Sequence, residues 1–413
     1  MQIHDKTLDV KTNLKTLTLL KSKAQPVWAG HPWVFQKAFD PNHAPQETPV
    51  SGELVLVEDA AHVPIGVGIY NATSLYRVRM LSRMSENLKT LPEILDRRIQ
   101  QAIQLRTHLN LPNPDTQAYR LINSEGDGLS GLTVDLYGEI LVISSSAYWV
   151  EAYKNLISER LQFHTGLKTL LWRPQEKSLL QDGWIAASHA DAPALSPPVQ
   201  HTQQIHQIRE SGLIYQIDFG RSQKTGFFFD QRENRVEIAK LAQGKRVLDL
   251  YCYVGGFALH AAQAGARYVL GIDSSASAIE SAKNHATLNQ LSQIEFQCRD
   301  ATQALAEARD YDLVILDPPK LVPSRTHLSQ AMRYAQNLHR QVLEAMKPGS
   351  FLLTCSCSSA ISQAHWVEML RNVGTSLKRS IQILKYLGAA PDHPTLPAFP
   401  EGQYLHGILL VIH

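Results

Sequence analysis

The sequence predicts an α/β protein in which a Rossmann-like domain follows a small α+β domain and an N-terminal β-barrel. The first observation is that, from about residue 234 onward, strand-like apolar runs alternate with helical segments. This alternation is typical of a doubly wound, mostly parallel sheet with helices on both faces. The second is a series of short, closely spaced strand signals near the N-terminus, typical of a small barrel. The third is the length, because 413 residues are enough for two or three domains.

Composition places the chain among ordinary globular proteins. Hydrophobic residues make up 44% and charged residues 19%, and the formal net charge of +2 neither favours nor excludes a nucleic-acid partner. The four cysteines lack the spacing of a zinc site, so we expect no metal and a reducing, cytoplasmic location. The sequence shows no signal-peptide core and no apolar run of membrane-spanning length, so we expect no membrane association.

We assign residues 1–84 to the barrel, followed by a polar linker at 82–90. Its strands are expected at residues 17–20, 54–57, 64–70 and 76–81. The barrel mixes aromatic and cationic side chains as RNA-binding surfaces often do. These residues are Trp33, Phe35, Tyr70, Tyr76, Arg77, Arg79 and Arg83. The alternative is that the aromatic rings fill the barrel core and the charges are solvated.

Residues 85–200 are assigned to the central α+β domain. Helical spacing of apolar residues predicts a helix at 91–109. A strand with a glycine-rich turn follows, and then a hairpin that turns near Gly138. The full set of expected segments is the strand and turn at 119–128, the hairpin at 132–143, a helix at about 149–163, a strand at 168–172 and a proline-rich loop at 190–199.

Residues 201–413 are assigned to the Rossmann-like domain, which opens with a hairpin at 205–220. Strands are expected at 246–250, 268–272, 294–297, 312–316 and 350–355, and helices at 257–264, 275–289, 300–307, 327–346 and 362–373. The last two strand signals, at 381–387 and 404–412, lack a clear crossover helix. A parallel pair needs such a crossover, so we expect an antiparallel edge.

The loop at residues 247–257 is the first candidate site. An apolar run ends on the acid of Asp249, passes Tyr253 and turns through Gly255 and a second glycine into a helix. Glycines let backbone N–H groups approach a ligand, and a helix N-terminus carries partial positive charge. The next strand ends in Asp273, where a carboxylate suits a ribose diol. The pair predicts a nucleoside-cofactor site.

Four acids at four successive strand ends narrow the cofactor. Asp249 and Asp273 are joined by Asp300, where an acid could meet an adenine amino group, and by Asp317. The loop is not of the G-x-G-x-x-G type, so a dinucleotide is less favoured. We therefore expect S-adenosylmethionine. The alternative is that each acid is a helix N-cap.

Two further blocks extend this candidate site. Asp317 opens the run D-P-P-K, a rigid wall that could grip the edge of a planar base, although a plain rigid turn is the alternative. The run K-T-G-F-F-F-D-Q-R is rich in aromatics that could cover the cofactor. Within it, Gln231 could bond the amino-acid end of the cofactor, and the alternative is a helix start capped by Asp230.

The run T-C-S-C-S places two thiols, Cys355 and Cys357, after the fifth strand. Their spacing of two puts both on the same face of a strand. A thiolate that adds to C6 of a pyrimidine makes C5 nucleophilic enough to accept a methyl group. The residues alone do not choose between the two thiols. The alternative is that both are inert core residues, which is common for buried cysteine.

Six blocks in order resemble one known family. They are G-H-P-W-V-F at 30–35, S-E-G-D-G-L-x-G-L-x-V-D at 124–135, K-T-G-F-F-F-D-Q-R-E-N-R at 224–235, D-L-Y-C-Y-V-G-G-F at 249–257, D-P-P-K at 317–320 and T-C-S-C-S at 354–358. The chain resembles the PUA-domain-containing class I S-adenosylmethionine-dependent methyltransferases that form 5-methylcytosine in 23S ribosomal RNA. The resemblance covers nearly the whole chain beyond residue 14.

The resemblance implies a PUA RNA-binding barrel, a central domain similar to one in uridine-modifying methyltransferases, and a catalytic Rossmann-like domain. It further implies Cys355 as the nucleophile, Asp317 beside it, and the four acids around the cofactor. A homodimer is also implied by resemblance. Many RNA cytosine-C5 methyltransferases carry a cysteine directly after the proline of the strand-four motif, and D-P-P-K has none. Release of the product would then depend on Cys357, or on another base that takes the C5 proton.

The resulting hypothesis is methylation of cytosine C5 in 23S rRNA through a covalent cysteine adduct. One alternative is methylation of a guanine or exocyclic nitrogen, which needs no thiol. Another is an RNA-binding or ribosome-assembly factor that keeps the fold without turnover. The intact acids and the T-C-S block argue against the last alternative, because a binding module has no need of a thiol there.

Overall fold

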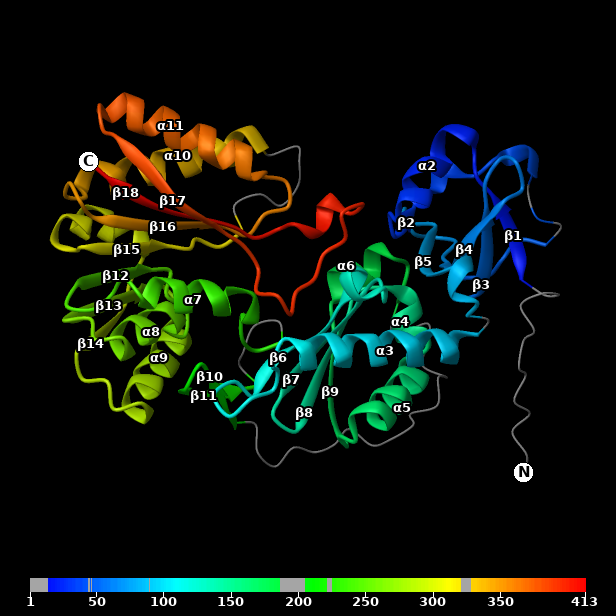
Figure 1. The fold of residues 1–413 in the computed structure, drawn as a ribbon, viewed down its shortest axis with the longest axis horizontal. Helices are drawn as coiled ribbons and strands as arrows, with labels where there is room; N and C mark the ends of the chain where they lie inside the picture. The colour runs from blue at the N-terminus through cyan, green and yellow to red at the C-terminus, as the bar shows by residue number, and fades with distance from the viewer. Residues whose placement is uncertain are drawn as a thin grey trace.

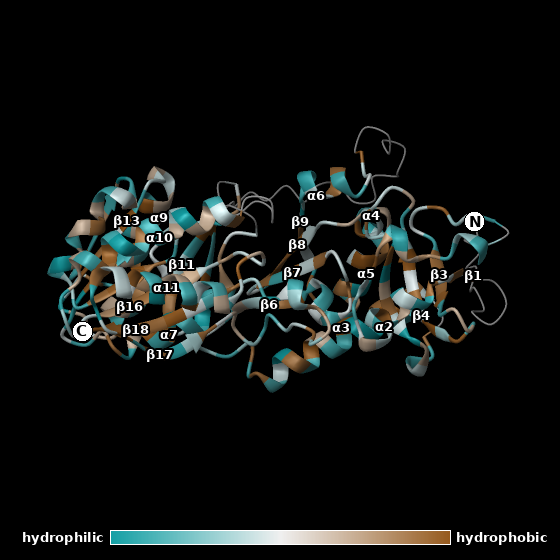
Figure 2. Ribbon diagram, turned by 90° about the horizontal axis from the view of Figure 1, so that it is seen from above, coloured by the Kyte–Doolittle hydropathy of each residue, from teal (hydrophilic) through white to brown (hydrophobic). Residues whose placement is uncertain are grey.

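The computed structural model describes residues 14–43, 45, 47–88, 90–185, 205–220, 225–320 and 328–413. An N-terminal barrel, a central α+β domain and a large C-terminal α/β domain follow one another along the long axis (Figures 1 and 2). The expected α/β class with a mostly parallel C-terminal sheet is confirmed. Within the described part of the chain, none of the helices combines the length and the apolar character that a membrane span requires.

The barrel is built on a five-stranded sheet in the order β1-β3-β4-β5-β2. Its strands are β1 (Lys15–Thr18), β2 (Trp33–Val34), β3 (Leu54–Glu58), β4 (Pro64–Tyr70) and β5 (Val78–Arg83). Helix α2 (Lys21–Ala29) was not expected from the sequence. Pro26 lies inside this helix and cannot donate a backbone hydrogen bond, and only Ala24 and Val27 are buried. The pattern therefore has no apolar stripe to reveal it.

The central domain has a four-stranded sheet in the order β6-β7-β8-β9. Its elements are α3 (Leu91–His108), β6 (Ala118–Asn123), β7 (Leu132–Tyr137), β8 (Ile140–Ser145), α4 (Tyr148–Ala152), α5 (Lys154–Thr165), β9 (Thr169–Pro174) and α6 (Glu176–Gln181). Helix α3 begins with a capping box between Thr90 and Glu93. The single helix expected near 149–163 is two helices, because Tyr153 leaves the helical backbone conformation. Its hydroxyl donates to the carbonyl of Gly52 in the barrel (2.9 Å).

The C-terminal domain contains a seven-stranded sheet in the order β14-β13-β12-β15-β16-β18-β17. The strands are β12 (Arg246–Leu250), β13 (Tyr268–Asp273), β14 (Ile294–Cys298), β15 (Leu313–Leu316), β16 (Phe351–Ser356), β17 (Ile381–Leu387) and β18 (His406–Ile412). β18 pairs antiparallel with both β16 and β17, which confirms the expected antiparallel edge. A separate hairpin of β10 (Ile205–Glu210) and β11 (Leu213–Asp218) precedes the sheet.

Alternate residues of the central strands feed two cores, one on each face of this sheet. Helices α7 (Arg232–Ala239), α8 (Gly256–Gln263) and α9 (Ala276–Leu288) contribute to one core. A 3₁₀ helix (Ala301–Asp310), α10 (Leu328–Ala345) and α11 (Gln363–Leu377) contribute to the other. The helices fall close to their expected positions. The segment expected at 300–307 is a 3₁₀ helix rather than an α-helix.

A long connection between β17 and β18, residues 388–405, joins all three parts of the molecule. We call it the strap. In Figure 1 it runs in orange and red out of the sheet toward the central domain and the barrel. The Phe399 ring packs edge-on against Trp33 of the barrel, with ring centroids 4.6 Å apart. Gly126 of the central domain lies so close to the Pro394 carbonyl that a Cβ would stand 1.8 Å from that oxygen. This close approach explains the glycine in the S-E-G-D-G run.

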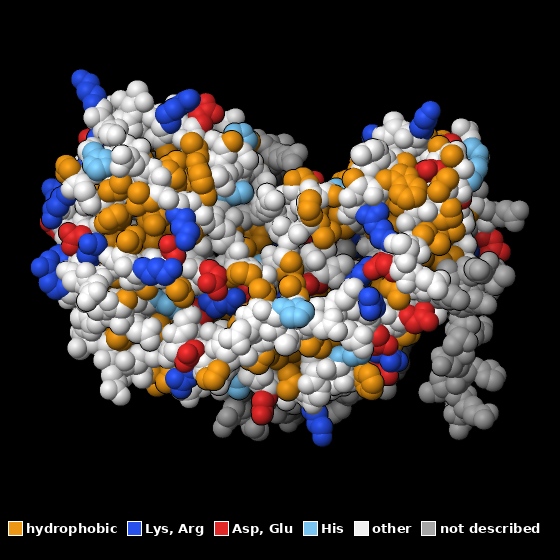
Figure 3. Space-filling model, viewed as in Figure 1, with side chains coloured by type: hydrophobic (Ala, Val, Ile, Leu, Met, Phe, Trp, Pro, Cys, Tyr) orange, Lys and Arg blue, Asp and Glu red, His pale blue; other side chains and the backbone are white. Residues whose placement is uncertain are grey.

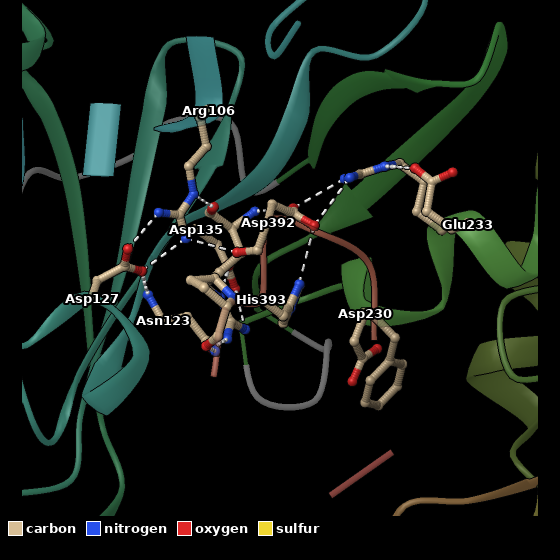
Figure 4. Close-up of polar contacts among 12 residues, drawn as sticks. Arg106, Asn123, Asp127, Asp135, Asp230, Glu233, Asp392 and His393 are labelled. Carbon is tan, nitrogen blue, oxygen red and sulfur yellow. Dashed lines mark hydrogen bonds and ion pairs between the residues drawn. The ribbon is translucent and has the colours of Figure 1, made fainter. Parts of the chain in front are cut away.

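Asp392 is the polar centre of the strap (Figure 4). Arg232 of α7 donates two bonds of 3.0 Å to its carboxylate, and the backbone N–H of Arg120 on β6 donates a third of 2.9 Å. Arg106 of α3 donates to the Asp392 carbonyl (2.7 Å). Burial opposes ionisation, but the bonds and charges of His393 and Arg232 hold the Asp392 carboxyl pKa below its ordinary value. The carboxylate thus stays charged and joins two domains.

We predict that Arg106→Met lowers the free energy of unfolding by about 3–5 kcal/mol, because it leaves the Asp127 carboxylate without its paired cation. Arg106 is fully buried and donates to both Asp127 oxygens (2.6 and 2.8 Å). Urea denaturation measures the change. The control is Arg371→Met, which removes an exposed pair with Glu368 on α11 and should change stability by less than about 0.5 kcal/mol. Equal effects of the two variants would refute a structural role for the buried pair.

Candidate functional site

The carboxyl edge of the large sheet holds the predicted loop after β12. Tyr251, Tyr253 and Gly255 have positive φ angles of 64°, 50° and 86°, so the chain turns sharply before α8 begins. A Cβ on Gly255 would stand 2.8 Å from the ring of Phe296, so glycine is needed for space as well as for φ. Gly255 is the N-cap residue of α8 and has no side chain to cap it, so the loop leaves backbone N–H groups at the helix start.

Asp249 lies fully buried on β12, below this loop. Its Oδ2 accepts a bond from the Ala258 N–H (3.0 Å), and its Oδ1 has no hydrogen-bond partner among the described residues. Burial raises the pKa of the carboxyl well above its ordinary value, and the charges of Asp317 and Asp273 raise it further. A buried carboxylate oxygen without a donor is costly in a folded chain, so a ligand donor or cation at this position would be stabilising.

Asp273, at the end of β13, holds the loop in place. Its Oδ2 accepts from the Tyr253 N–H and its Oδ1 from the Ser275 N–H, both at 2.9 Å. Asp300 follows β14 and is exposed, and its Oδ1 accepts from both the N–H and the hydroxyl of Thr302 (2.8 Å each). Asp300 therefore acts as a helix N-cap, which was the alternative interpretation of these acids. Asp300 accepts both hydrogen bonds through the same oxygen, Oδ1.

Asp317 and Gln231 are brought together at the end of β15. Gln231 Nε2 donates to Asp317 Oδ2 (2.9 Å), and Asn234 donates to Gln231 Oε1 (2.6 Å). Burial, followed by the charge of Asp230, raises the pKa of the Asp317 carboxyl to about 7, against the opposing effects of Arg235 and the Gln231 bond. Gln231 was expected at the amino-acid end of a cofactor, and that role stays a prediction.

The two thiols lie on one face at the end of β16, as their spacing predicts. Cys355 pairs with Gly407 of β18 and is fully buried. Burial, then the charge of Asp317, raises the pKa of its thiol well above the ordinary value. Cys357 lies beyond the strand and is half-buried, with Sγ 3.8 Å from the Pro318 carbonyl oxygen. The second thiol therefore lies beside the D-P-P-K wall.

The sequence analysis did not assign Asp230 and Tyr404 to the site. Asp230 was considered only as a helix cap, and Tyr404 only as the first residue of a strand. Neither the 3₁₀ turn at Phe229–Gln231 nor α7 has a side-chain cap. Instead, the Tyr404 hydroxyl donates to Asp230 Oδ2 (2.7 Å). The two residues are 174 positions apart, so only the fold of the strap could reveal this pair.

A cavity of about 350 Å³ lies beside the predicted loop. Tyr253 and Val254 form one wall, Ser275 and Ala278 of the α9 start another, and hairpin residues such as Gln216 a third. The buried carboxylates do not line it. It therefore adjoins the carboxyl edge rather than coinciding with it.

Comparison with known proteins agrees with this fold. The family model for S-adenosylmethionine-dependent methyltransferases matches residues 192–400, and the model for the PUA-like domain matches residues 17–83. Ribosomal RNA large subunit methyltransferase I of Aeromonas hydrophila is 30% identical over 405 residues, which is 96% of this chain and 98% of the relative. The protein of the same name from Aeromonas salmonicida is 31% identical over 401 residues, 95% and 98% of the two chains.

Solved structures show the same architecture. A candidate SAM-dependent methyltransferase from Streptococcus mutans has a TM-score of 0.78 at 18% identity, over 96% of this chain and 100% of that chain. A candidate methyltransferase complexed with SAH has a TM-score of 0.80 at 17% identity, with the same coverage. At these identities the likeness shows a shared fold.

Three features are typical of a nucleoside-binding α/β enzyme domain. They are the order of the strands, the loop after β12 with its positive φ angles, and the carboxylates at successive strand ends. With the matches above, the chain belongs to the S-adenosylmethionine-dependent methyltransferases, in a branch with an N-terminal PUA-like domain. The residues fit this cofactor, because the unpartnered oxygen of Asp249 and the excess of carboxylates suit its amino and sulfonium charges. Asp249, Asp273 and the N–H groups near Gly255 are the groups that would hold it. When bound, the cofactor supplies the methyl group.

We predict that Asp273→Ala weakens binding of S-adenosylhomocysteine roughly 10- to 100-fold, the cost of losing one or two charge-assisted bonds. Isothermal titration calorimetry measures the dissociation constant. The control Glu295→Ala removes an exposed carboxylate on the neighbouring strand, whose bonds go to Tyr268 and Gln297 and not to the loop. An unchanged dissociation constant in Asp273→Ala would place this residue outside the cofactor site.

Proposed function

We propose that the protein methylates C5 of a cytosine in the 23S RNA of the large ribosomal subunit, through a covalent bond between a cysteine and the base. The observation that carries this proposal is a half-buried thiol, Cys357, beside the Pro318 carbonyl at the edge where the methyl donor binds. The names of the relatives, which act on large-subunit ribosomal RNA, support the substrate class.

The cysteine thiolate makes C5 of the cytosine base nucleophilic enough to take a methyl group. C5 of cytosine is a weak nucleophile, so a thiolate first adds to C6 and places electron density on C5. C5 then forms a bond to the methyl group and S-adenosylhomocysteine leaves. Loss of the C5 proton to a base and cleavage of the C6–S bond restore the aromatic ring and the thiolate. A methyl transfer to nitrogen would need neither thiol.

Accessibility favours Cys357 over Cys355 as the thiol that attacks. Cys355, the nucleophile implied by the family resemblance, is fully buried in the sheet, and burial opposes formation of its thiolate. Cys357 lies two residues farther along the chain, just beyond the end of β16, and retains exposed surface. A base that enters along the D-P-P-K wall meets Cys357 first. We therefore infer that Cys357 is the nucleophile and that Cys355 packs beneath it.

Asp317 is suited to assist the addition step. Its carboxyl, with a pKa of about 7, is protonated in a substantial fraction of molecules at neutral pH. A protonated carboxyl can donate a hydrogen bond to cytosine N3, which draws electrons from C6 and favours attack by the thiolate. Gln231 fixes the orientation of the Asp317 carboxyl through its 2.9 Å bond.

The shape of the molecule supports a large polyanionic substrate. Figure 3 shows a hollow between the methyltransferase domain and the barrel, bordered by apolar side chains with both basic and acidic side chains nearby. On the barrel, Phe35 is 47% exposed and can stack on a base. Arg79 was a candidate RNA contact, but it is buried against Asp182 (3.2 Å) and belongs to the core. Arg83 donates to the Val27 carbonyl at the end of α2.

We predict that Cys357→Ala abolishes a denaturation-resistant adduct with 23S rRNA transcripts that contain 5-fluorocytidine. Fluorine at C5 blocks the proton loss, so the C6 thiol adduct of the wild type should accumulate. The matched control Cys355→Ala should retain the adduct. Gel mobility under denaturing conditions and transfer of labelled methyl groups are the measurements.

Other outcomes separate the rival functions. Loss of the adduct only in Cys355→Ala would make the buried thiol the nucleophile. Methyl transfer to unmodified rRNA without any adduct in the wild type would exclude the thiol mechanism and favour a nitrogen target. Binding of rRNA with no methyl transfer would support a role in ribosome assembly.

A further inference from the structure

We propose that Asp230 is a specificity-determining residue that accepts a hydrogen bond from the exocyclic amino group of the target base, so that the site selects cytosine over uracil. This inference rests on the proposed function and adds the group that recognises the base. Asp230 belongs to the 3₁₀ turn Phe229–Gln231, immediately before α7.

One carboxylate oxygen of Asp230 accepts a hydrogen bond within the protein, and the other accepts none from the described residues. The Tyr404 hydroxyl donates to Oδ2 (2.7 Å), which fixes the plane of the carboxylate. Oδ1 is buried and has no hydrogen-bond partner among the described residues. A buried carboxylate oxygen without a donor carries a desolvation cost, which a donor on a bound substrate would remove.

Asp230 shares its surroundings with the proposed reaction centre. Its charge contributes to the raised pKa values of both Asp317 and Cys355, so the three groups lie within electrostatic reach of each other. The neighbour in sequence, Gln231, bonds directly to Asp317. Asp230 therefore stands beside the residues that we expect to contact the base.

Anchoring the strap does not by itself account for the free oxygen. The Asp230 carbonyl already accepts from the Ala390 N–H (2.8 Å), so the backbone holds the strap at this point. The Tyr404 bond uses only Oδ2. A purely structural residue at this position would need one acceptor, and Oδ1 is left over.

A hydrogen-bond donor at Asp317 together with an acceptor at Asp230 matches the edge of cytosine and not that of uracil. Cytosine presents an acceptor at N3 and a donor at the amino group on C4, whereas uracil presents a donor at N3 and an acceptor at O4. A donor on protonated Asp317 and the acceptor oxygen Oδ1 of Asp230 form the complement of cytosine. With uracil, the N3–H donor would face the donor on Asp317, and the O4 acceptor would face the acceptor on Asp230.

The test is Asp230→Asn, whose amide can donate to O4. The modified cytosine is first mapped by bisulfite sequencing of 23S rRNA transcripts treated with the wild type. Two transcripts are then made, with cytosine or uracil at that position, and kcat/KM is measured on each. We predict that the ratio of cytosine to uracil activity falls at least about 10-fold, with a rise in absolute activity on uracil. Glu233→Gln is the matched control, since Glu233 is an exposed carboxylate at the start of α7.

The pH profile gives a second readout that a structural defect would not produce. Asp317 acts as a donor only when protonated, so kcat/KM on cytosine should fall as the pH rises through about 7. Removing the charge of Asp230 lowers the pKa of Asp317, and the falling limb should move to lower pH in Asp230→Asn. The charged and titratable groups around Asp317 are Asp230, Arg235, Asp249, Cys355 and Cys357.

Tyr404→Phe keeps the ring and removes the hydroxyl that fixes Asp230, and it should weaken base discrimination in the same direction. An unchanged cytosine-to-uracil ratio in Asp230→Asn, with S-adenosylhomocysteine binding retained, would overturn the inference. If Asp230→Asn loses this binding, Tyr404→Phe decides instead, and an unchanged ratio there overturns the inference. Failure of the wild type to form 5-methylcytosine at all would overturn the proposed function itself, which is a separate result.

Discussion

The structure depends on the ion pair between Arg232 and Asp392. It lies where three parts of the chain meet, and the backbone of Arg120 and the guanidinium of Arg106 complete the coordination of the strap. Charges of this kind are expensive to bury unless they are paired and hydrogen-bonded, which is the case here. The cluster joins the strap and α7 to the central domain. The contact of Phe399 with Trp33 extends this connection to the barrel.

The class of fold and the order of the strands could be predicted because their signals are local. Apolar runs such as the one at residues 246–250 read directly as strands, and glycine at 255 marks the turn. Helix α2 could not be predicted, because Pro26 and a polar composition hide it. The break at Tyr153 depends on a contact with the barrel, which no local pattern records.

The acidic residues of the candidate site could be predicted from the sequence, but the residues that contact them could not. A strand-end position identifies Asp249, Asp273 and Asp317, since parallel strands end at one edge. The link between Asp230 and Tyr404 depends on the path of the strap, and the different burial of the two thiols depends on pairing with β18. Arg235 is near the acids, but its charge is engaged with Glu210 (2.5 Å). The edge therefore holds more carboxyl groups than unengaged cations among the described residues.

The different burial of the two cysteines has a consequence for the chemical durability of the enzyme. Oxidation of thiols to sulfenic and higher acids follows accessibility and thiolate character. Cys355 is a residue of β16, pairs with Gly407 of β18 and is fully buried, whereas Cys357 is partly exposed to solvent. Of these two thiols, oxidants would therefore reach Cys357 first and leave the packing of the sheet intact. Under the proposed mechanism, damage of this kind would silence the enzyme without unfolding it, and a thiol reductant would restore it from the sulfenic state.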